Sequence, residues 1–183
     1  MLSPAGDAQN PGRALFDSFE RGVARQLAEA LKKRLENELN IRVVLTHEAG
    51  ESVTQEQKAT FANRLKVDLY LALSVIPGDR LTLSSLYYKT ANMPLQPSSK
   101  LSLYPSTQAY LFNAQKTSNW ASLFSKQSVT SLLYNRALGA PIKSLEGILA
   151  PAFDVEMTIT ALGDVYSYLE PLSAALKEML HEQ

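Results

Sequence analysis

The sequence predicts an α/β domain whose central sheet is mixed, mostly parallel and flanked by helices. Short runs of apolar and β-branched residues alternate along the chain with amphipathic stretches of helical length. The chain has 183 residues, of which 45% are hydrophobic, which suits one domain with a substantial core. We therefore expect residues 1–183 to form a single domain, as a segment of a longer protein.

The first half of the chain contains two helical stretches and two strand-like runs. An apolar residue recurs every four positions within residues 20–39, which predicts a helix with the stripe Val23, Leu27, Leu31 and Leu35. Residues 41–46 are rich in β-branched side chains and predict a strand. Ser52, with Gln55 three positions later, resembles a capping box that opens a helix ending near residue 65. Residues 67–75 are nearly all apolar and predict a buried strand.

The second half predicts strands over residues 81–88 and 152–159, and helices over residues 119–134 and 169–180. Between them, residues 90–106 carry three prolines among serine and asparagine. This stretch predicts a long irregular connection, a type of segment that often has a functional role.

Composition excludes several classes of protein. The 18 basic and 18 acidic residues cancel, so the chain lacks the positive field of a nucleic-acid-binding protein. The absence of cysteine excludes disulfides, thiolate catalysis and cysteine-based zinc sites. No stretch approaches the ~20 apolar residues of a membrane-spanning helix. Imidazole chemistry would have to use His47 and His181.

Four segments, in order and at matching spacing, resemble the zinc-dependent N-acetylmuramoyl-L-alanine amidases that trim bacterial peptidoglycan. Residues 2–12 (LSPAGDAQNPG) are similar to the family pattern L-D-P-G-H-G-G-x-D-P-G, and Glu20 is similar to the glutamate that opens the following helix. Residues 43–47 (VVLTH) and 67–75 (VDLYLALSV) resemble V-V-L-T-R and A-D-L-F-I-S-I-H-A. Residues 142–157 resemble the segment that leads to P-A-V-L-V-E-L-G-F.

The resemblance implies a site that this chain has largely lost. In the family, two histidines and the helix-opening glutamate bind zinc, and a later glutamate acts as the general base. Matched position by position, the histidines correspond to Gly6 and Ser74, while the two glutamates remain as Glu20 and Glu156. Glycine offers no side-chain ligand, and a serine hydroxyl is a poor zinc ligand. We therefore predict that zinc is absent and that Glu156 is a vestigial base.

Other uses of these residues remain open. Neither His47 nor His181 matches a ligand position, and we expect both to face solvent. Strand alternation places Asp154 beside Glu156, so Glu20, Asp154 and Glu156 are candidates for an oxygen-ligand site for Ca²⁺ or Mg²⁺. The alternative is a hydrogen-bonded Glu156 with Asp154 on a solvated edge.

Tyrosines form another candidate binding group. Tyr87, Tyr88 and Tyr104 surround the proline-rich connection, where aromatic side chains can stack on sugars or fill an interface. The alternative, which we favour, is that they pin this connection to the body of the domain.

Only two residues precede Ser3, whereas the family has a central strand of several apolar residues there. We therefore predict that the first strand is truncated or missing and that residues 1–12 are irregular. A longer protein or a dimer partner would then cover the exposed sheet edge.

The resemblance thus implies a catalytically degenerate amidase-like domain of the periplasm or cell envelope, which binds or scaffolds. Its expected partner is peptidoglycan or an envelope protein. The alternatives are an active amidase with a rearranged metal site and a structural homodimerisation module.

Overall fold

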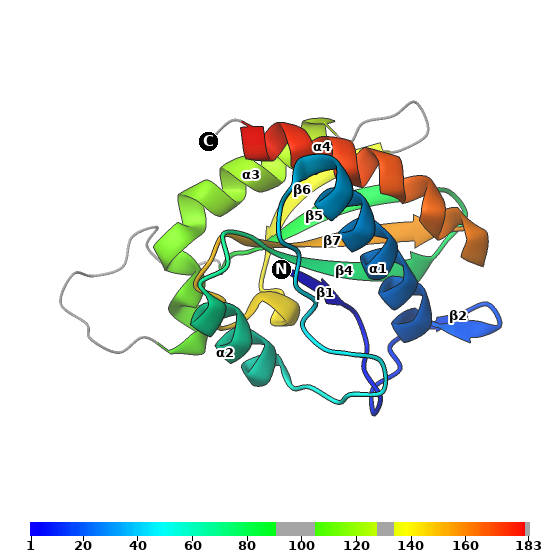
Figure 1. Ribbon diagram of the computed structural model, residues 1–183, viewed down its shortest axis with the longest axis horizontal. Helices are drawn as coiled ribbons and strands as arrows, with labels where there is room; N and C mark the ends of the chain where they lie inside the picture. The colour runs from blue at the N-terminus through cyan, green and yellow to red at the C-terminus, as the bar shows by residue number, and fades with distance from the viewer. Residues whose placement is uncertain (91–104, 128–133, 182–183) are drawn as a thin grey trace.

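The computed structural model of the protein describes residues 1–90, 105–127 and 134–181 (Figure 1). Its main sheet has the strand order β1-β4-β7-β5-β6. β1 (Leu2–Pro4), β4 (Tyr70–Pro77) and β7 (Ala152–Ile159) are parallel to one another. β5 (Thr82–Tyr88) is antiparallel to β7, and β6 (Tyr134–Ala140) is parallel to β5. The predicted mixed, mostly parallel sheet is confirmed.

Helices cover both faces of this sheet (Figure 1). One face packs against α1 (Glu20–Leu39), α3 (Ala114–Gln127) and α4 (Leu169–His181). The other face carries α2 (Gln55–Leu65). Short 3₁₀ segments connect these elements: η1 (Ser106–Asn113), η2 (Lys143–Leu145) and η3 (Leu162–Tyr168). A small hairpin of β2 (Ala14–Leu15) and β3 (Ser18–Phe19) directly precedes α1. No helix in the described ranges is long and apolar enough to cross a bilayer.

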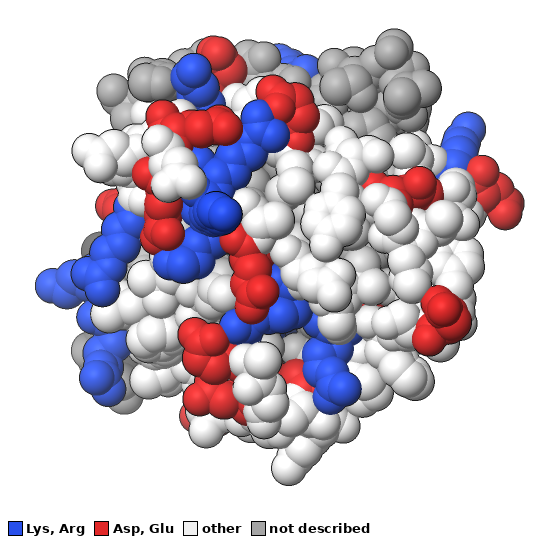
Figure 2. Space-filling view, turned by 45° about the vertical axis from the view of Figure 1, so that its right-hand side comes forward, with Lys and Arg blue, Asp and Glu red and all other residues white. Residues whose placement is uncertain are grey.

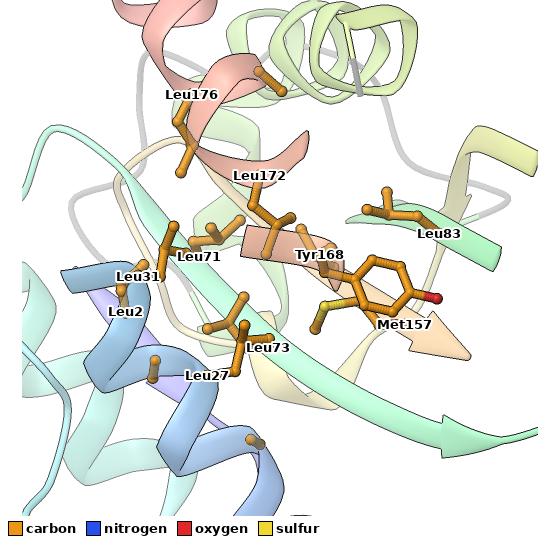
Figure 3. Close-up of a cluster of buried hydrophobic side chains, with 14 of the residues drawn as sticks. Leu2, Leu27, Leu31, Leu71, Leu73, Leu83, Met157, Tyr168, Leu172 and Leu176 are labelled. Atoms are coloured by element: carbon orange, nitrogen blue, oxygen red, sulfur yellow. The ribbon is translucent and has the colours of Figure 1, made fainter. Parts of the chain in front are cut away.

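The main core lies between the sheet and the three-helix layer. The predicted stripe of α1 is buried there and packs toward leucines of β4 and α4, including Leu71, Leu73, Leu172 and Leu176 (Figure 3). Burying one such side chain stabilises the fold by about 1.5–3 kcal/mol. The core under α2 is smaller and includes Tyr70, Ala72, Leu145 and Ile148. Most of the hydrophobic stabilisation therefore comes from the first face.

The first strand corrects one prediction. Residues 1–12 are not irregular throughout, because Leu2–Pro4 forms β1, in parallel register with Leu71–Leu73 of β4. The strand has three residues, beside the eight of β4. β4 therefore has a neighbour from this chain on the side where we expected an exposed edge.

Residues 41–46 form only an isolated bridge between Leu45 and Leu2, so the predicted regular strand is wrong. On the side of β1, this segment has only a three-residue strand to pair with, through the Val44 carbonyl and the Thr46 N–H. On its other side, the Lys32 ammonium donates to the Val43 carbonyl, and Glu36 Oε1 accepts from the Val43 N–H at 3.1 Å. These side chains of α1 cover the outer edge of the segment, which is a recognised protection of sheet edges.

Two helix boundaries also differ from the predictions. α2 begins two residues later than the Ser52 signal suggested, because Thr54 and Gln57 make the capping box. The helix expected over residues 119–134 begins earlier, at Ala114, and ends at Gln127. Tyr134 instead starts β6, which we did not predict because its sequence, YNRALGA, contains no β-branched residue. Residues 91–104 of the proline-rich connection lie outside the described ranges.

Candidate functional site

The residues that the resemblance singled out meet near the middle of the parallel strands β4 and β7, just beyond the carboxyl end of β1, whose last residue, Pro4, pairs with Leu73. Register pairs Ser74 with Glu156 and Ala72 with Asp154, so Ser74, Asp154 and Glu156 share the sheet face that α2 covers. Glu20, the first residue of α1, enters from the side of the β2–β3 hairpin. In open α/β sheets, ligands commonly bind outside the carboxyl ends of the strands. The cluster is therefore our candidate functional site.

Glu20 is buried, and its carboxylate is fully engaged. Oε1 accepts from the Val75 N–H at 2.9 Å, and Oε2 accepts from the Arg13 N–H at 3.1 Å. Gly12, with φ of +77°, makes room for this arrangement, since a Cβ atom there would lie 2.9 Å from Glu20 Oε2. The local sequence thus holds the carboxylate against backbone donors instead of leaving its oxygens free.

Arg13 supplies a positive charge to the cluster. Its Nη1 lies 3.1 Å from Glu20 Oε1, and its Nη2 lies 3.7 Å from Glu156 Oε2. The guanidinium is half exposed, while Glu156 keeps 28% of its side chain exposed. One arginine therefore bridges Glu20 and Glu156, the two glutamates that the resemblance singled out.

Asp154 is buried, so the expectation of a solvated edge is wrong. Its Oδ2 accepts from the Ser144 hydroxyl at 2.7 Å and from the Ser74 hydroxyl at 3.2 Å. Its Oδ1 is buried and forms no hydrogen bond with the described residues. Burial raises the pKa of Asp154 above its ordinary range, against the two serine hydrogen bonds, which lower it.

The donor set does not fit zinc. Gly6 has φ of +76°, and a Cβ atom there would lie 2.8 Å from the Cβ of Arg21, so this backbone has no room for histidine. Ser74 directs its hydroxyl to Asp154, and Glu20 is occupied as described. Within the described residues, no group of three or more His, Cys, Asp or Glu side chains is arranged to hold a metal. Glu20, Asp154 and Glu156, the candidates for an oxygen-ligand site, are therefore not grouped as a metal site in the described structure.

The two histidines lie apart from these positions. His47 is buried rather than solvent-facing, with Nδ1 2.9 Å from the Thr46 hydroxyl oxygen. Burial lowers its pKa below the ordinary 6.5, and the nearby Lys58 charge lowers it further. The side chain of His181, at the end of α4, falls outside the described part of the structure.

The tyrosines separate into different environments. Tyr88 is 9% exposed in the core under α2, and its ring centroid lies 4.9 Å from that of Tyr110. Tyr87 is partly buried against the main core. These contacts support a role in holding the connection to the domain. Tyr104 lies outside the described residues.

Sequence reasoning missed Arg13 and Ser144. Arg13 directly follows the matched Pro11-Gly12 pair, so its position next to a site loop was a usable signal. Ser144 lies in η2, ten residues before Asp154, and nothing local in the sequence marks it.

Comparisons with known proteins agree with this architecture. No protein-family model matches the sequence, and no curated protein matches it. Solved structures do match, including N-acetylmuramoyl-L-alanine amidases from Mycobacterium smegmatis (Ami1) and Clostridium difficile 630. Their TM-scores are 0.71 and 0.70, each with 13% identity, covering 100% and 99% of this chain and 96% and 93% of theirs. The CwlD amidase from Clostridioides difficile, solved in complex with the GerS lipoprotein, has a TM-score of 0.63 at 15% identity, covering 100% of this chain and 98% of its own. The chain therefore has the fold of the catalytic domain of N-acetylmuramoyl-L-alanine amidases.

Proposed function

We propose that this domain is a catalytically inactive amidase-fold module of the bacterial cell envelope, which binds peptidoglycan or an envelope protein without zinc. The observation that carries the proposal is the bridge that Arg13 makes between Glu20 and Glu156. A metal-dependent hydrolase needs a cation beside these carboxylates to activate water. Here the chain supplies a cation of its own, and a guanidinium cannot ionise a bound water as zinc does.

The remaining groups favour binding over hydrolysis. Glu156 has an arginine partner and a partly exposed side chain, so its carboxylate can accept hydrogen bonds from a ligand. Asp154 is tied to two serines inside the sheet face and is not available to a substrate. The site thus offers a pair of opposite charges, Arg13 and Glu156, on the polar face of the sheet, and such a pair can recognise a polar ligand without reacting with it.

The choice of partner rests on the structural neighbours, which are cell-wall amidases, one of them solved with a lipoprotein. The surface is consistent with a partner other than nucleic acid. On the face seen in Figure 2, acidic and basic side chains intermingle over one half, while the other half is largely uncharged. Among the described residues on that face, there is no extended basic patch of the kind that phosphate backbones select.

Metal analysis and a sacculus assay test the proposal. Protein purified without chelators should contain no stoichiometric zinc, and added zinc should not release peptide stems from purified peptidoglycan. The protein should co-sediment with sacculi, and Arg13→Gln should weaken this binding while the matched Arg80→Gln, at an exposed residue, should not. Stoichiometric zinc, or hydrolysis that Glu156→Gln abolishes, would overturn the inactive assignment. Failure to co-sediment would exclude peptidoglycan and leave an envelope protein as the partner.

A further inference from the structure

The charged pair of the candidate site, Arg13 and Glu156, keeps most of its hydrogen-bonding capacity. Nη2 of Arg13 lies 3.7 Å from Oε2 of Glu156, which is an ion contact but too long for a hydrogen bond. The guanidinium uses Nη1 on Glu20, so its Nε and Nη2 groups donate to no residue within the described ranges. In the same part of the chain, no residue donates a hydrogen bond to the Glu156 carboxylate. The pair therefore presents free donors next to free acceptors.

Two serine oxygens extend the acceptor side of this pair. The hydroxyls of Ser74 and Ser144 both donate to Asp154 Oδ2, at 3.2 Å and 2.7 Å. Since a serine hydroxyl carries a single proton, both oxygens keep lone pairs for a further donor. Ser74 is the register partner of Glu156 on the neighbouring strand, about 4.8 Å away, and both side chains are partly exposed. A donor group that reaches Glu156 can therefore also reach the Ser74 oxygen.

We propose that the site binds an α-amino acid group, with its ammonium on Glu156 and Ser74 and its carboxylate on the Arg13 guanidinium. The ammonium brings three donors to the acceptor side, and the carboxylate accepts the two parallel N–H bonds that Nε and Nη2 of a guanidinium offer. Both charges of such a group sit on one carbon atom, so they suit a donor and an acceptor that lie only 3.7 Å apart. The inference rests on the proposed function, because it names the chemical group that the binding module recognises.

The charge balance of the site disfavours simpler ligands. Arg13, together with Glu20 and Glu156, carries an excess of one negative charge, so the site repels a carboxylate that brings no positive charge. A primary amine would satisfy Glu156 but leave the Arg13 donors without an acceptor. A group that carries both charges satisfies the two sides together and adds no net charge.

Glycine is the probe that tests this proposal, because it is the smallest molecule with both charges. Its binding to isotope-labelled protein is followed by the NMR shifts of the Arg13 Nε–H group and of the Val75 amide, which donates to Glu20. We expect saturable shifts with glycine. Binding should be weaker by about tenfold or more with N-acetylglycine, which lacks the ammonium, and with glycinamide, which lacks the carboxylate. Equal binding of the three compounds, or no binding of glycine, overturns the proposal.

Matched variants assign the two charges. Glu156→Gln removes the partner of the ammonium, and Arg13→Lys keeps the positive charge but loses the two parallel donors, so each should weaken glycine binding by about tenfold or more. Glu178→Gln and Arg80→Lys, the same changes at exposed residues elsewhere, should leave the affinity unchanged. Glu156→Gln alters a side chain whose one ion pair is the contact with Arg13, so we expect it to fold. Unchanged glycine affinity in this variant overturns the proposal.

The proposed function and this inference fail in different ways. Stoichiometric zinc or hydrolysis of peptidoglycan would overturn the proposed function, and the inference with it. A zinc-free, inactive protein that co-sediments with sacculi but does not bind glycine would overturn only the inference.

Discussion

The two faces of β7 carry side chains of opposite character, one apolar and fully buried and the other largely polar. On one face, Phe153, Val155, Met157 and Ile159 are all fully buried against the three-helix layer. On the other, Asp154, Glu156 and Thr158 carry polar side chains, and α2 covers only part of the surface. The comparison teaches that the first face holds the fold together, which leaves the second face free to change its chemistry while the fold persists.

The largest effect expected from this comparison is on the apolar face. Phe153→Ala removes a side chain that is 0% exposed and packs on Phe124 with ring centroids 5.2 Å apart. We expect a loss of about 3–5 kcal/mol in the free energy of unfolding, measured by urea denaturation. Glu156→Ala, three residues along on the other face, should change stability by less than about 1 kcal/mol. Equal losses of unfolding free energy in the two variants would contradict the conclusion that the apolar face holds the fold together.

Next in size is the loop that carries Arg13 to the polar face. Gly12→Ala adds a Cβ atom 2.9 Å from Glu20 Oε2 at a φ of +77°, and should cost about 2–4 kcal/mol from strain and displacement of the carboxylate. Gly50→Ala is the matched control, since Gly50 has φ of +85° and no atom within 4 Å of the added carbon. It should cost about 1 kcal/mol, from strain alone. Thermal unfolding of both variants compares them, and a similar loss would mean that Glu20 is not held as described.

The buried acid of the polar face gives a smaller, pH-dependent effect. Because burial raises the pKa of Asp154 above 3.8, the folded protein binds this proton more tightly than the unfolded chain does. Stability from this group therefore falls as pH rises from about 4 through the raised pKa. Asp154→Asn should remove that slope and increase stability at pH 7, as measured by urea denaturation across pH. A destabilised variant at pH 7 would show that the ionised carboxylate is a favourable partner.

The smallest effect concerns His47. Its lowered pKa means that the unfolded chain binds the proton more readily, so stability is lost as pH falls below 6.5. His47→Gln should flatten the stability profile between pH 6.5 and 5 while changing stability at pH 8 little. If the variant loses as much stability between pH 6.5 and 5 as the wild-type protein does, groups other than His47 cause that loss.

Much of the fold follows from local patterns. The helix over residues 20–39 and the strand over residues 152–159 have the predicted boundaries, because a four-residue stripe and an apolar run after Pro151 mark them. β6 has no such signal and owes its strand form to the backbone of β5. Residues 41–46 have a strong strand signal, yet the neighbouring β1 is only three residues long and pairs with them at a single bridge. In both segments a tertiary contact overrides local preference.

The candidate site follows from sequence only in part. The resemblance groups Glu20, Ser74 and Glu156 in one site, and the structure also brings them together around the middle of β4 and β7. The burial of Asp154 was not predictable, since it depends on Ser144 from a distant irregular segment. The bridging role of Arg13 depends on a side-chain direction that spacing does not encode.

The contact of α1 with Val43 also governs how the helix sits. Lys32 and Glu36 are one turn apart and hydrogen-bond to the C=O and the N–H of the same residue, Val43. Sliding the helix by a turn, or rotating it about its axis, would break both bonds at once. The two side chains therefore fix the position of the 20-residue α1 along its axis. The leucine stripe alone would tolerate a shift of the helix by one turn, because its apolar residues recur every four positions.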